Sequence, residues 1–386
     1  MDIPYVEESW SFIPAKSLAD LTSAERFWQA HQPWLKERGY MLRPRFRPGW
    51  VPSWQGTDKE PLECEDGLRL EMANLMDARR IRDNMDVCLK RIDVEIFPHE
   101  QDIGTYLSSE PLASDPRNHC VPILETLQVP NRSELRILVM PLLRRYEQPR
   151  FDTFGETIDF FDQIFEGVKF MHDHNITHRD CIGNNIMMDG SKTFPDGFHP
   201  VRYKKKQDLS GTAKFYTRTQ RPPKYYLIDF GLSRRYETRD PPPLEPPIEG
   251  GDPNAPEFRF RANGRLPPES CDPFPTDIYY LGRLILGGFI EGYSGIGRDN
   301  HKHGFEFMKA LADDMVGEDP AKRPTIDEVI ERFAAIRDSL SSWKLRSRVV
   351  RSRDFPNPSR PMKHWLRRVW FIIRRTPSVP SYRKRC

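Results

Sequence analysis

The segment His178-Arg179-Asp180-Cys181-Ile182-Gly183-Asn184-Asn185 and the later tripeptide Asp229-Phe230-Gly231 decide how the rest of this sequence is interpreted. In the first segment the carboxylate Asp180 lies five positions before the amide Asn185, and the tripeptide begins with a second carboxylate. An apolar helical pattern leads into the first segment, and the run Tyr225–Ile228 predicts a strand directly before the tripeptide. Each group of polar side chains therefore follows a regular element.

The flanking sequence predicts an α+β fold. Strand patterns are found at three places, 86–92, 121–126 and 135–143. Apolar residues spaced by three and four predict helices at 98–108, 158–171, 278–289 and 326–340. Because most strands precede residue 144 and most helices follow it, we expect a small β-rich lobe and a larger helical lobe. Residues 16–40 predict a further helix, in which Thr22 and Glu25 have the spacing of a capping box.

Composition excludes several classes of protein. Hydrophobic residues make up 38% of the 386 positions, which is enough for a substantial core. The six cysteines are widely spaced without a C-x-x-C pair, a pattern that suits neither a disulfide scaffold nor a structural zinc site. The segment Met1–Tyr5 lacks a basic, apolar leader, and no apolar run approaches the roughly 18 residues that span a bilayer. We therefore expect an intracellular protein, cytoplasmic or nuclear.

Five residues could together carry out phosphoryl transfer, which needs positioned phosphates, metal ligands and a proton acceptor. Lys90, at the end of a predicted strand, could hold phosphate oxygens, and Glu100, on the following helix, could hold Lys90 by an ion pair. Asp180 could accept the proton of a hydroxyl substrate. Asn185 and Asp229 offer oxygen ligands of the kind that Mg²⁺ prefers. Each residue alone is most often an ordinary surface or structural group, so the prediction depends on the five occurring together in this order.

These residues resemble the motifs of the Ser/Thr/Tyr protein kinase superfamily, over about residues 70–340. The resemblance implies a two-lobed kinase fold and assigns supporting roles outside the chemistry to His178, Arg179, Glu257, Asp277 and Arg323. In that family Asp277 would brace the catalytic loop, and Arg323 would pair with Glu257. More closely, 116–122 and 216–222 resemble kinase-like sequences of mushroom-forming fungi, a group for which no particular substrate is implied.

The resemblance also implies a division of the chain and an adenine-binding segment. The expected parts are an extension with one helix, a kinase domain with its insertion, and a basic tail: 1–69, 70–340 (N-lobe 70–143, C-lobe 144–340, insertion 191–224) and 341–386. Met140 stands where the residue behind the adenine pocket is expected, and Pro141 and Leu143 would follow in the connector between lobes. Pro141 lacks an N–H and could offer adenine only its carbonyl.

Three departures from the kinase pattern bear on activity. The region before Lys90 lacks a glycine-rich phosphate loop, and 64–78 contains only Gly67. Ile182 occupies the position at which Ser/Thr kinases typically carry a phosphate-contacting lysine. The insertion at 191–224 is unusually long; we expect a solvated hairpin on the helical lobe. The alternative is that its cations replace the missing lysine, and the candidates are Lys204–Lys206, Arg218 and Arg221.

The segment after the tripeptide is rich in proline and offers few phosphorylation sites. Arg179 normally meets an activating phosphate in kinases. Here we expect the prolines, together with Glu245 or Glu249, to order the segment without modification.

The tail is the most basic part of the chain. Residues 341–386 hold 14 Lys and Arg against one Asp, and 365–375 alternate apolar and cationic residues as an interfacial helix does. One hypothesis is that residues 363–385 contact an anionic membrane surface or an acidic partner. The alternatives are docking on the acidic remainder of the chain, nuclear targeting or disorder.

Two function classes are consistent with the sequence. The first is an ATP- and Mg²⁺-dependent protein kinase, with serine or threonine as the expected acceptor. The second is a pseudokinase, a binding module that keeps the fold with weak or no phosphoryl transfer. The five chemical residues favour the enzyme, and the missing glycines and lysine favour the binding module.

Overall fold

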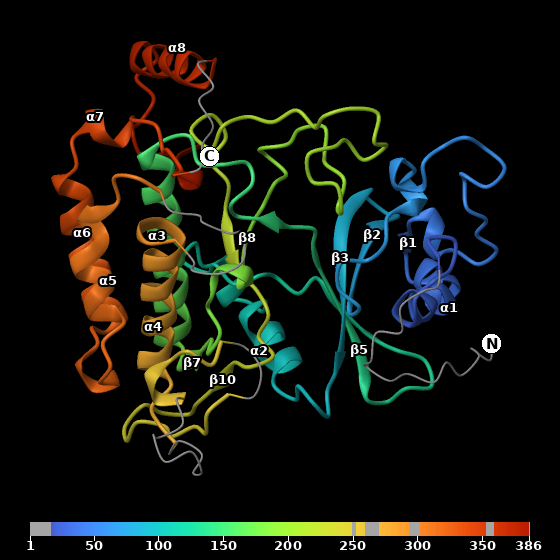
Figure 1. The fold of residues 1–386 in the computed structure, drawn as a ribbon. Helices are drawn as coiled ribbons and strands as arrows, with labels where there is room; N and C mark the ends of the chain where they lie inside the picture. The colour runs from blue at the N-terminus through green and yellow to red at the C-terminus, as the bar shows by residue number, and fades with distance from the viewer. Residues whose placement is uncertain (1–16, 249–251, 259–269, 293–301, 353–358, 386) are drawn as a thin grey trace. The chain divides into compact units, whose positions relative to one another are not determined.

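The computed structural model describes residues 17–248, 252–258, 270–292, 302–352 and 359–385 (Figure 1). The chain forms two compact units, and it passes between them several times. Unit 1 comprises Met1–Gln101, Val121–Arg144 and Asp189–Phe215. Unit 2 comprises Asp102–Cys120, Arg145–Met188 and Tyr216–Cys386. Unit 1 contains an extended sheet and unit 2 is mainly helical, which confirms the predicted α+β class.

The sheet of unit 1 has five strands in the order β1-β2-β3-β5-β4, and every pair is antiparallel. Their bounds are β1 Tyr40–Leu42, β2 Leu75–Arg80, β3 Met85–Asp93, β4 Glu125–Gln128 and β5 Leu135–Pro141. The predicted strand at 121–126 begins late, at Glu125. Pro122 explains the difference, because proline has no N–H to contribute to a ladder.

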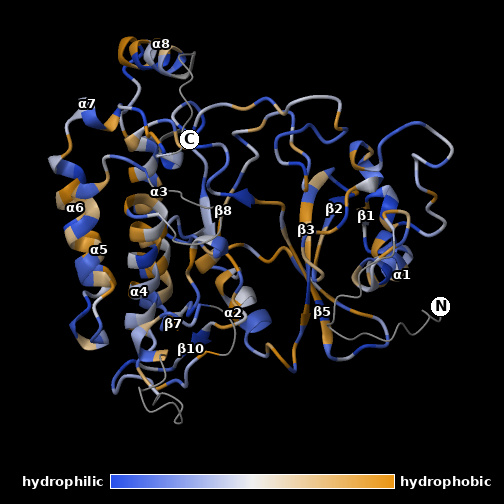
Figure 2. Ribbon diagram, viewed as in Figure 1, coloured by the Kyte–Doolittle hydropathy of each residue, from blue (hydrophilic) through white to orange (hydrophobic). Residues whose placement is uncertain are grey.

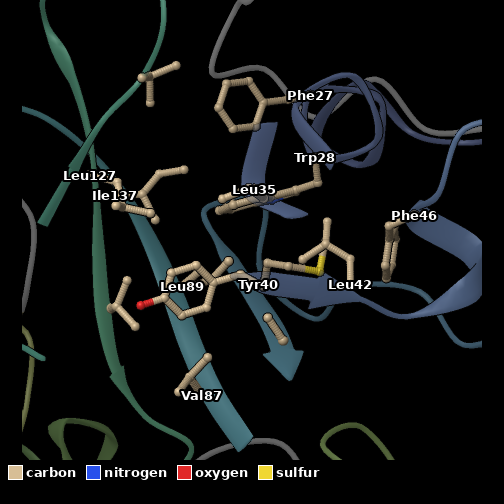
Figure 3. Close-up of a cluster of buried hydrophobic side chains, with 14 of the residues drawn as sticks. Phe27, Trp28, Leu35, Tyr40, Leu42, Phe46, Val87, Leu89, Leu127 and Ile137 are labelled. Atoms are coloured by element: carbon tan, nitrogen blue, oxygen red, sulfur yellow. The ribbon is translucent and has the colours of Figure 1, made fainter. Parts of the chain in front are cut away.

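Helix α1 (Ser23–Glu37) covers one face of this sheet. The predicted capping box is present: the Thr22 hydroxyl accepts from the Glu25 N–H, and the Glu25 carboxylate accepts from the Thr22 N–H. The buried cluster between helix and sheet is drawn in Figure 3 and includes Phe27, Trp28, Leu35, Val87, Leu89 and Ile137. Helix α1 of the N-terminal extension is thus part of the core of unit 1.

The segment between β1 and β2 wraps around this core in three short 3₁₀ turns, Pro44–Phe46, Pro61–Glu63 and Glu65–Gly67. Arg45, fully buried, anchors the wrap, because its guanidinium donates to both oxygens of Glu25 at 3.0 and 3.1 Å. A buried ion pair of this geometry satisfies both charges away from water.

Most of the insertion packs within unit 1, unlike the solvated hairpin expected on the helical lobe. Phe194 and Phe198 are buried, with the Arg144 guanidinium 3.9 and 4.3 Å from their ring centres. Gln207 donates to Asp86 of β3 at 2.6 Å and accepts from Arg79 of β2 at 2.7 Å. The insertion therefore packs on unit 1 through its aromatic residues. Its mostly polar composition did not predict this packing.

Unit 2 is built around α3 (Phe154–Asp173), α4 (Phe274–Ile285) and α6 (Ile326–Ser339), and α4 continues as a π-helix, Leu286–Ile290. The other helices are α2 Glu100–Leu107, which begins in unit 1, α5 Lys309–Met315, α7 Ser342–Leu345 and α8 Ser359–Ile373. The short strands are β6 Arg144–Arg145, β7 Ile176–Thr177, β8 Ile186–Met188, β9 Tyr225–Leu227 and β10 Arg234–Arg235. Figure 2 shows the hydrophobic positions of these helices, which form an aromatic core that includes Phe160, Phe161, Phe165, Phe289 and Phe333.

None of the helices in the described part of the chain has the length and apolar character needed to cross a bilayer.

Candidate active site

Lys90 lies on β3, on the sheet face opposite the α1 core. Successive residues of a strand point to opposite faces, and its neighbour Leu89 belongs to the buried α1 cluster. In the antiparallel β3–β5 pair Lys90 is opposite Leu138, and Cys88 is opposite Met140. Directly opposed residues share a face, so Met140 and Lys90 lie on the same face of the sheet.

Lys90 is held by Glu100, the first residue of α2. The Lys90 ammonium donates to the Glu100 carboxylate, and both side chains are buried. A buried ammonium and a buried carboxylate are each costly alone and are stabilised as a pair. The pair fixes the position of the ammonium group at the sheet surface.

The segment predicted to bind adenine continues β5 alongside β3. Pro141 ends β5 opposite Val87, and the Leu142 N–H donates to the Asp86 carbonyl at 3.1 Å. Leu143 is buried. This part of the chain thus extends the Lys90-bearing face without a break.

The described turn between β2 and β3, residues 81–84, contains no glycine, although the carbonyl of Gly39, before β1, accepts from the Ile81 N–H at the start of that turn, at 2.8 Å. Gly67 lies in a 3₁₀ turn, where an added Cβ would be 1.8 Å from the Pro61 carbonyl oxygen. Gly67 therefore serves close backbone packing of the wrap and is not part of a phosphate loop.

In unit 2 the buried carboxylate of Asp277, in the first turn of α4, organises the segment that begins at His178. It accepts hydrogen bonds from the backbone N–H groups of His178 and Arg179, at 2.9 and 2.7 Å. His172 Nε2, on α3, is 2.9 Å from the same carboxylate. Asp277 therefore joins α3, α4 and the loop that carries Asp180.

His178 is fully buried, and its two ring nitrogens have different roles. Nε2 faces the Ile228 carbonyl at 3.1 Å, which requires a donor, and Nδ1 accepts from the Asp180 N–H at 3.3 Å. A neutral imidazole protonated on Nε2 satisfies both contacts. Burial lowers the pKa of His178, although the charges of Asp277 and Asp229 act in the opposite direction.

Two residues next to the chemical groups have left-handed backbones. Arg179 has φ 64° and Asp229 has φ 68°, a conformation that is uncommon for residues other than glycine. Such conformations cost on the order of 1–3 kcal/mol and persist where the surroundings enforce them. For Arg179 the enforcing contact is the hydrogen bond from its N–H to Asp277.

Asp180 is paired with Asn185. The Asn185 side-chain N–H₂ group donates to the Asp180 carboxylate at 2.7 Å and to its carbonyl at 2.9 Å. The second carboxylate oxygen, Oδ1, is buried and has no hydrogen bond of ordinary geometry from the described residues. Burial raises the pKa of Asp180 to about 7; the Asn185 hydrogen bond opposes this shift, the charge of Asp229 adds to it, and the nearby Asp252 backbone acts to lower the pKa. The carboxyl group is oriented and retains a lone pair that could take a proton.

Asn185 and Asp229 are adjacent in the structure although 44 positions separate them in the sequence. Strands β8 and β9 pair with Ile186 opposite Leu227, and the Ile228 N–H donates to the Asn185 carbonyl at 3.0 Å. Because the Asn185 amide nitrogen is turned to Asp180, its amide oxygen remains for another partner. That oxygen and the exposed Asp229 carboxylate are hard donors that fit a magnesium ion bound together with phosphate and water.

The segment after Asp229 is tied to Arg179 by an acidic side chain. Arg179 Nη1 is 3.4 Å from the Glu245 carboxylate, and Arg179 Nη2 donates to the Pro246 carbonyl at 2.6 Å. Arg234 Nε is 3.7 Å from the same carboxylate. Of the two acids suggested by the sequence, Glu245 makes this contact, and Glu249 lies outside the described residues.

Not all cations of the insertion remain candidates to replace the phosphate-contacting lysine whose position Ile182 occupies. Arg218 is fully buried in unit 2, where it donates to the Tyr225 hydroxyl and to the Tyr146 and Pro149 carbonyls. This role is structural, and the sequence pattern around Arg218 does not indicate it. Arg221 stacks on Tyr216, with its guanidinium 5.3 Å from the ring centre.

The Lys204–Lys206 group belongs to the part of the insertion that packs in unit 1. A tight hairpin contains it, with Lys205 bridged to Thr212, and the hairpin is attached to β2 and β3 through Gln207. Asp86, the partner of Gln207, alternates with Cys88 and Lys90 on one face of β3. These lysines are therefore attached to the strand that carries Lys90.

The other two residues that the resemblance selected form an ion pair within unit 2. Arg323 donates to both Glu257 oxygens, at 2.8 and 2.7 Å, and to the Pro275 and Gly317 carbonyls. Thr276 also donates to Glu257, at 2.7 Å. The Arg323 guanidinium and the Glu257 carboxylate are thus both buried and hydrogen-bonded within the protein.

Comparison with known proteins finds a partial match. The chain is 27% identical over 193 residues to a protein of Acanthamoeba polyphaga mimivirus named "Putative serine/threonine-protein kinase R436". The match covers 46% of this chain and about half, 55%, of the viral protein. No protein-family model matches the sequence. The similarity thus points toward a kinase-like relationship over part of the chain.

Proposed function

We propose that this chain is a protein kinase of the two-lobed type, which transfers the γ-phosphate of ATP to a protein hydroxyl, with serine or threonine as the acceptor. The observation that carries the proposal is the arrangement of Asp180, Asn185 and Asp229, which is held by Asp277 and by the β8–β9 pairing. The partial similarity to the viral kinase-like protein supports the same class of reaction.

In this proposal Asp180 acts as the proton acceptor. As the acceptor oxygen bonds to the γ-phosphorus, its proton passes to the Asp180 carboxylate, and the bond from the γ-phosphorus to the bridging oxygen breaks to release ADP. Asn185 orients the carboxylate by its hydrogen bond of 2.7 Å. Lys90, positioned by Glu100, would hold phosphate oxygens of ATP, and the face that bears Met140, Pro141 and Leu143 would receive adenine.

Magnesium would be held by Asn185 and Asp229 and would neutralise charge on the phosphates. The exposed Asp229 carboxylate and the remaining Asn185 oxygen are the donors for it. Ile182 provides no cation for the transferring phosphate, and the Lys204–Lys206 hairpin is attached through Gln207 to the strands of unit 1, one of which carries Lys90.

A pseudokinase is the second candidate. It is favoured by the absence of a glycine-lined turn in the described residues between β2 and β3 and by the apolar Ile182. Such a protein would bind nucleotide through the Lys90–Glu100 pair and transfer phosphate slowly or not at all.

Phosphate incorporation from labelled ATP into a general protein substrate distinguishes the two. With Mg²⁺ present, we expect transfer by the wild-type chain and a loss on the order of 10² or more in Asp180→Asn and Lys90→Met. Asp58→Asn and Lys59→Met, two exposed positions of unit 1, are the matched controls and should retain transfer. Phosphoamino acid analysis then identifies the acceptor.

Equal phosphate incorporation in the wild type, Asp180→Asn and Lys90→Met would indicate a contaminating kinase. It would contradict the proposal that this chain transfers phosphate. In that case a melting temperature that rises with ATP in the wild type, and not in Lys90→Met, supports the binding module.

A further inference from the structure

Helix α8 is attached to unit 2 by its polar side. His364 and Arg368 are buried, and Arg367 donates to both oxygens of Asp152 at 2.9 Å. His364 Nδ1 is 3.3 Å from the same carboxylate. Burial alone would raise the pKa of Asp152, but the hydrogen bonds and charges of His364 and Arg367 hold it below its usual range. The cationic side of the helix is therefore committed to the protein.

The opposite side of α8 is apolar and exposed. Seven large hydrophobic residues lie there at helical spacings, with exposed fractions from 43% to 74%: Met362, Trp365, Leu366, Val369, Trp370, Ile372 and Ile373. We refer to these seven residues as the α8 apolar face. Phe371 is the apolar residue of this helix segment that points to the protein and is buried. Figure 2 shows the alternation of hydrophobic and hydrophilic positions along α8.

The neighbouring helix α7 extends this surface. Trp343 is 62% exposed, and its ring centre is 6.2 Å from that of Trp365. Arg368 lies over Trp343, 3.5 Å from the ring centre, and donates to the Trp343 carbonyl at 3.0 Å. The two tryptophans are thus fixed side by side by a shared cation.

This orientation is the reverse of the usual one for a helix on a protein surface. An amphipathic helix that served only the fold would bury its apolar side, because burial of apolar area contributes about 25 cal/mol per Å². Contiguous exposed apolar patches on proteins mark interaction sites. The α8 apolar face therefore requires an apolar environment outside the described chain.

The charged residues around the α8 apolar face indicate what kind of apolar environment it contacts. Residues 355–386 contain no Asp or Glu, and Lys363, Arg374 and Arg375 are exposed beside the apolar residues. Arg374 lies over Trp370, 5.1 Å from its ring centre. The surroundings of the face carry a net positive charge.

We propose that the α8 apolar face, together with Trp343, binds the interfacial region of an anionic lipid bilayer. Tryptophan is enriched at membrane interfaces, and flanking lysine and arginine bind anionic headgroups. An apolar helix face bordered by such residues inserts at the boundary between headgroups and acyl chains without spanning the bilayer. The combination of exposed aliphatic residues, exposed tryptophans and flanking cations on this side of α8 fits this environment better than a folded protein surface.

Co-sedimentation of the full chain with lipid vesicles tests the proposal. We expect binding to vesicles of phosphatidylcholine with phosphatidylserine, and binding at least about tenfold weaker to phosphatidylcholine alone, because each basic residue near an anionic surface contributes on the order of 1 kcal/mol. Leu366→Glu/Ile373→Glu should lose binding. Trp365→Ser/Trp370→Ser should weaken it about tenfold or more without adding negative charge.

A matched control is Val51→Glu/Leu62→Glu, which alters residues of unit 1 that are 67% and 52% exposed and should bind vesicles as the wild type does. Leu366 and Ile373 are 67% and 74% exposed, so their variant should keep the wild-type melting temperature. Equal binding to neutral and anionic vesicles, or retained binding in Leu366→Glu/Ile373→Glu, overturns the proposal. The proposal is also overturned if the wild type is a dimer, Leu366→Glu/Ile373→Glu is a monomer, and neither protein binds vesicles. That result would show that the α8 apolar face binds a second copy of the chain.

Discussion

Arg323 holds Glu257 through two hydrogen bonds, of 2.8 and 2.7 Å, although 66 positions separate the two residues. The pair connects the segment before α4 with the turn before α6, and Arg323 also donates to the Pro275 and Gly317 carbonyls. Burial raises the pKa of a carboxyl group, but Arg323 outweighs this effect and holds the pKa of Glu257 below its usual range. Removal of either charge would leave its partner buried and unpaired.

We therefore predict that Arg323→Leu lowers the free energy of unfolding by about 3–5 kcal/mol. The measurement is urea unfolding followed by tryptophan fluorescence. The control is Arg332→Leu, which removes an exposed pair with Asp314 and should cost less than about 1 kcal/mol. Similar losses in the two variants would contradict the structural role assigned to Arg323.

A second prediction concerns the contact of Glu245 with Arg179. On the proposed function this carboxylate would take the place of an activating phosphate. Ser233, which is close in sequence, is buried and donates to the His178 carbonyl, so it is not accessible for modification in this conformation. We expect Glu245→Ala to make the segment 231–248 more susceptible to limited proteolysis and, on the proposed function, to reduce phosphate transfer severalfold.

The control is Thr238→Ala at an exposed position of the same segment, which should leave proteolysis and transfer unchanged. Phosphatase treatment of the wild type should change neither the proteolysis of the segment nor the rate of phosphate transfer. A loss of transfer after phosphatase would mean that a phosphate, and not Glu245, orders the segment.

Features that depend on residues close together in the sequence could be predicted, and features that depend on contacts between distant segments could not. The strands β3 and β5, the helices α3 and α6 and the capping box of α1 follow from local periodicity and from Thr22 and Glu25, so the prediction found them. Motif spacing similarly selected Asp180 and Asn185, which are in contact.

Long-range packing was not predictable in the same way. The insertion reads as polar chain, yet Phe194 and Phe198 pack on Arg144, and this contact joins segments about 50 positions apart. The pattern of α8 predicts an amphipathic helix but not which side faces the protein. That choice is made by Asp152, which is 212 positions before His364.

A third prediction concerns the N-terminal extension. Trp28 of α1 is fully buried in the core of unit 1 and donates to the Ala73 carbonyl at 3.4 Å. Trp28→Ala should lower the free energy of unfolding by about 3–5 kcal/mol, because it leaves a large cavity. Trp34→Ala, on the partly exposed side of the same helix, should cost clearly less. If urea unfolding gave equal effects, α1 would not be part of the sheet core.

The fourth prediction follows from the neutral state of His178. Its Nδ1 accepts the Asp180 N–H, and its Nε2 donates to the Ile228 carbonyl, so protonation of Nδ1 would place two donors against each other. Burial lowers the pKa of His178, whereas in the unfolded chain histidine titrates at about 6.5. Below that pH the unfolded chain binds a proton that the folded chain does not, so the stability that neutral His178 contributes is present above about pH 6.5 and is lost as the pH falls.

His178 should therefore contribute a decrease in the free energy of unfolding of up to about 1.4 kcal/mol per pH unit between about pH 7 and pH 5, whereas Asp180, whose pKa burial raises to about 7, acts in the opposite direction. His178→Gln, whose amide can still donate to Ile228, should be less stable at neutral pH and lack the His178 contribution to the slope. Buried His31 and His119, whose pKa values burial also lowers, and Asp162, whose pKa burial raises to about 6, contribute to the residual dependence in both proteins. The control is His303→Gln at an exposed position, which should keep the wild-type slope. If the slope in His178→Gln equals that of the wild type, His178 is already protonated in the folded protein and the Asp180 N–H must have another acceptor.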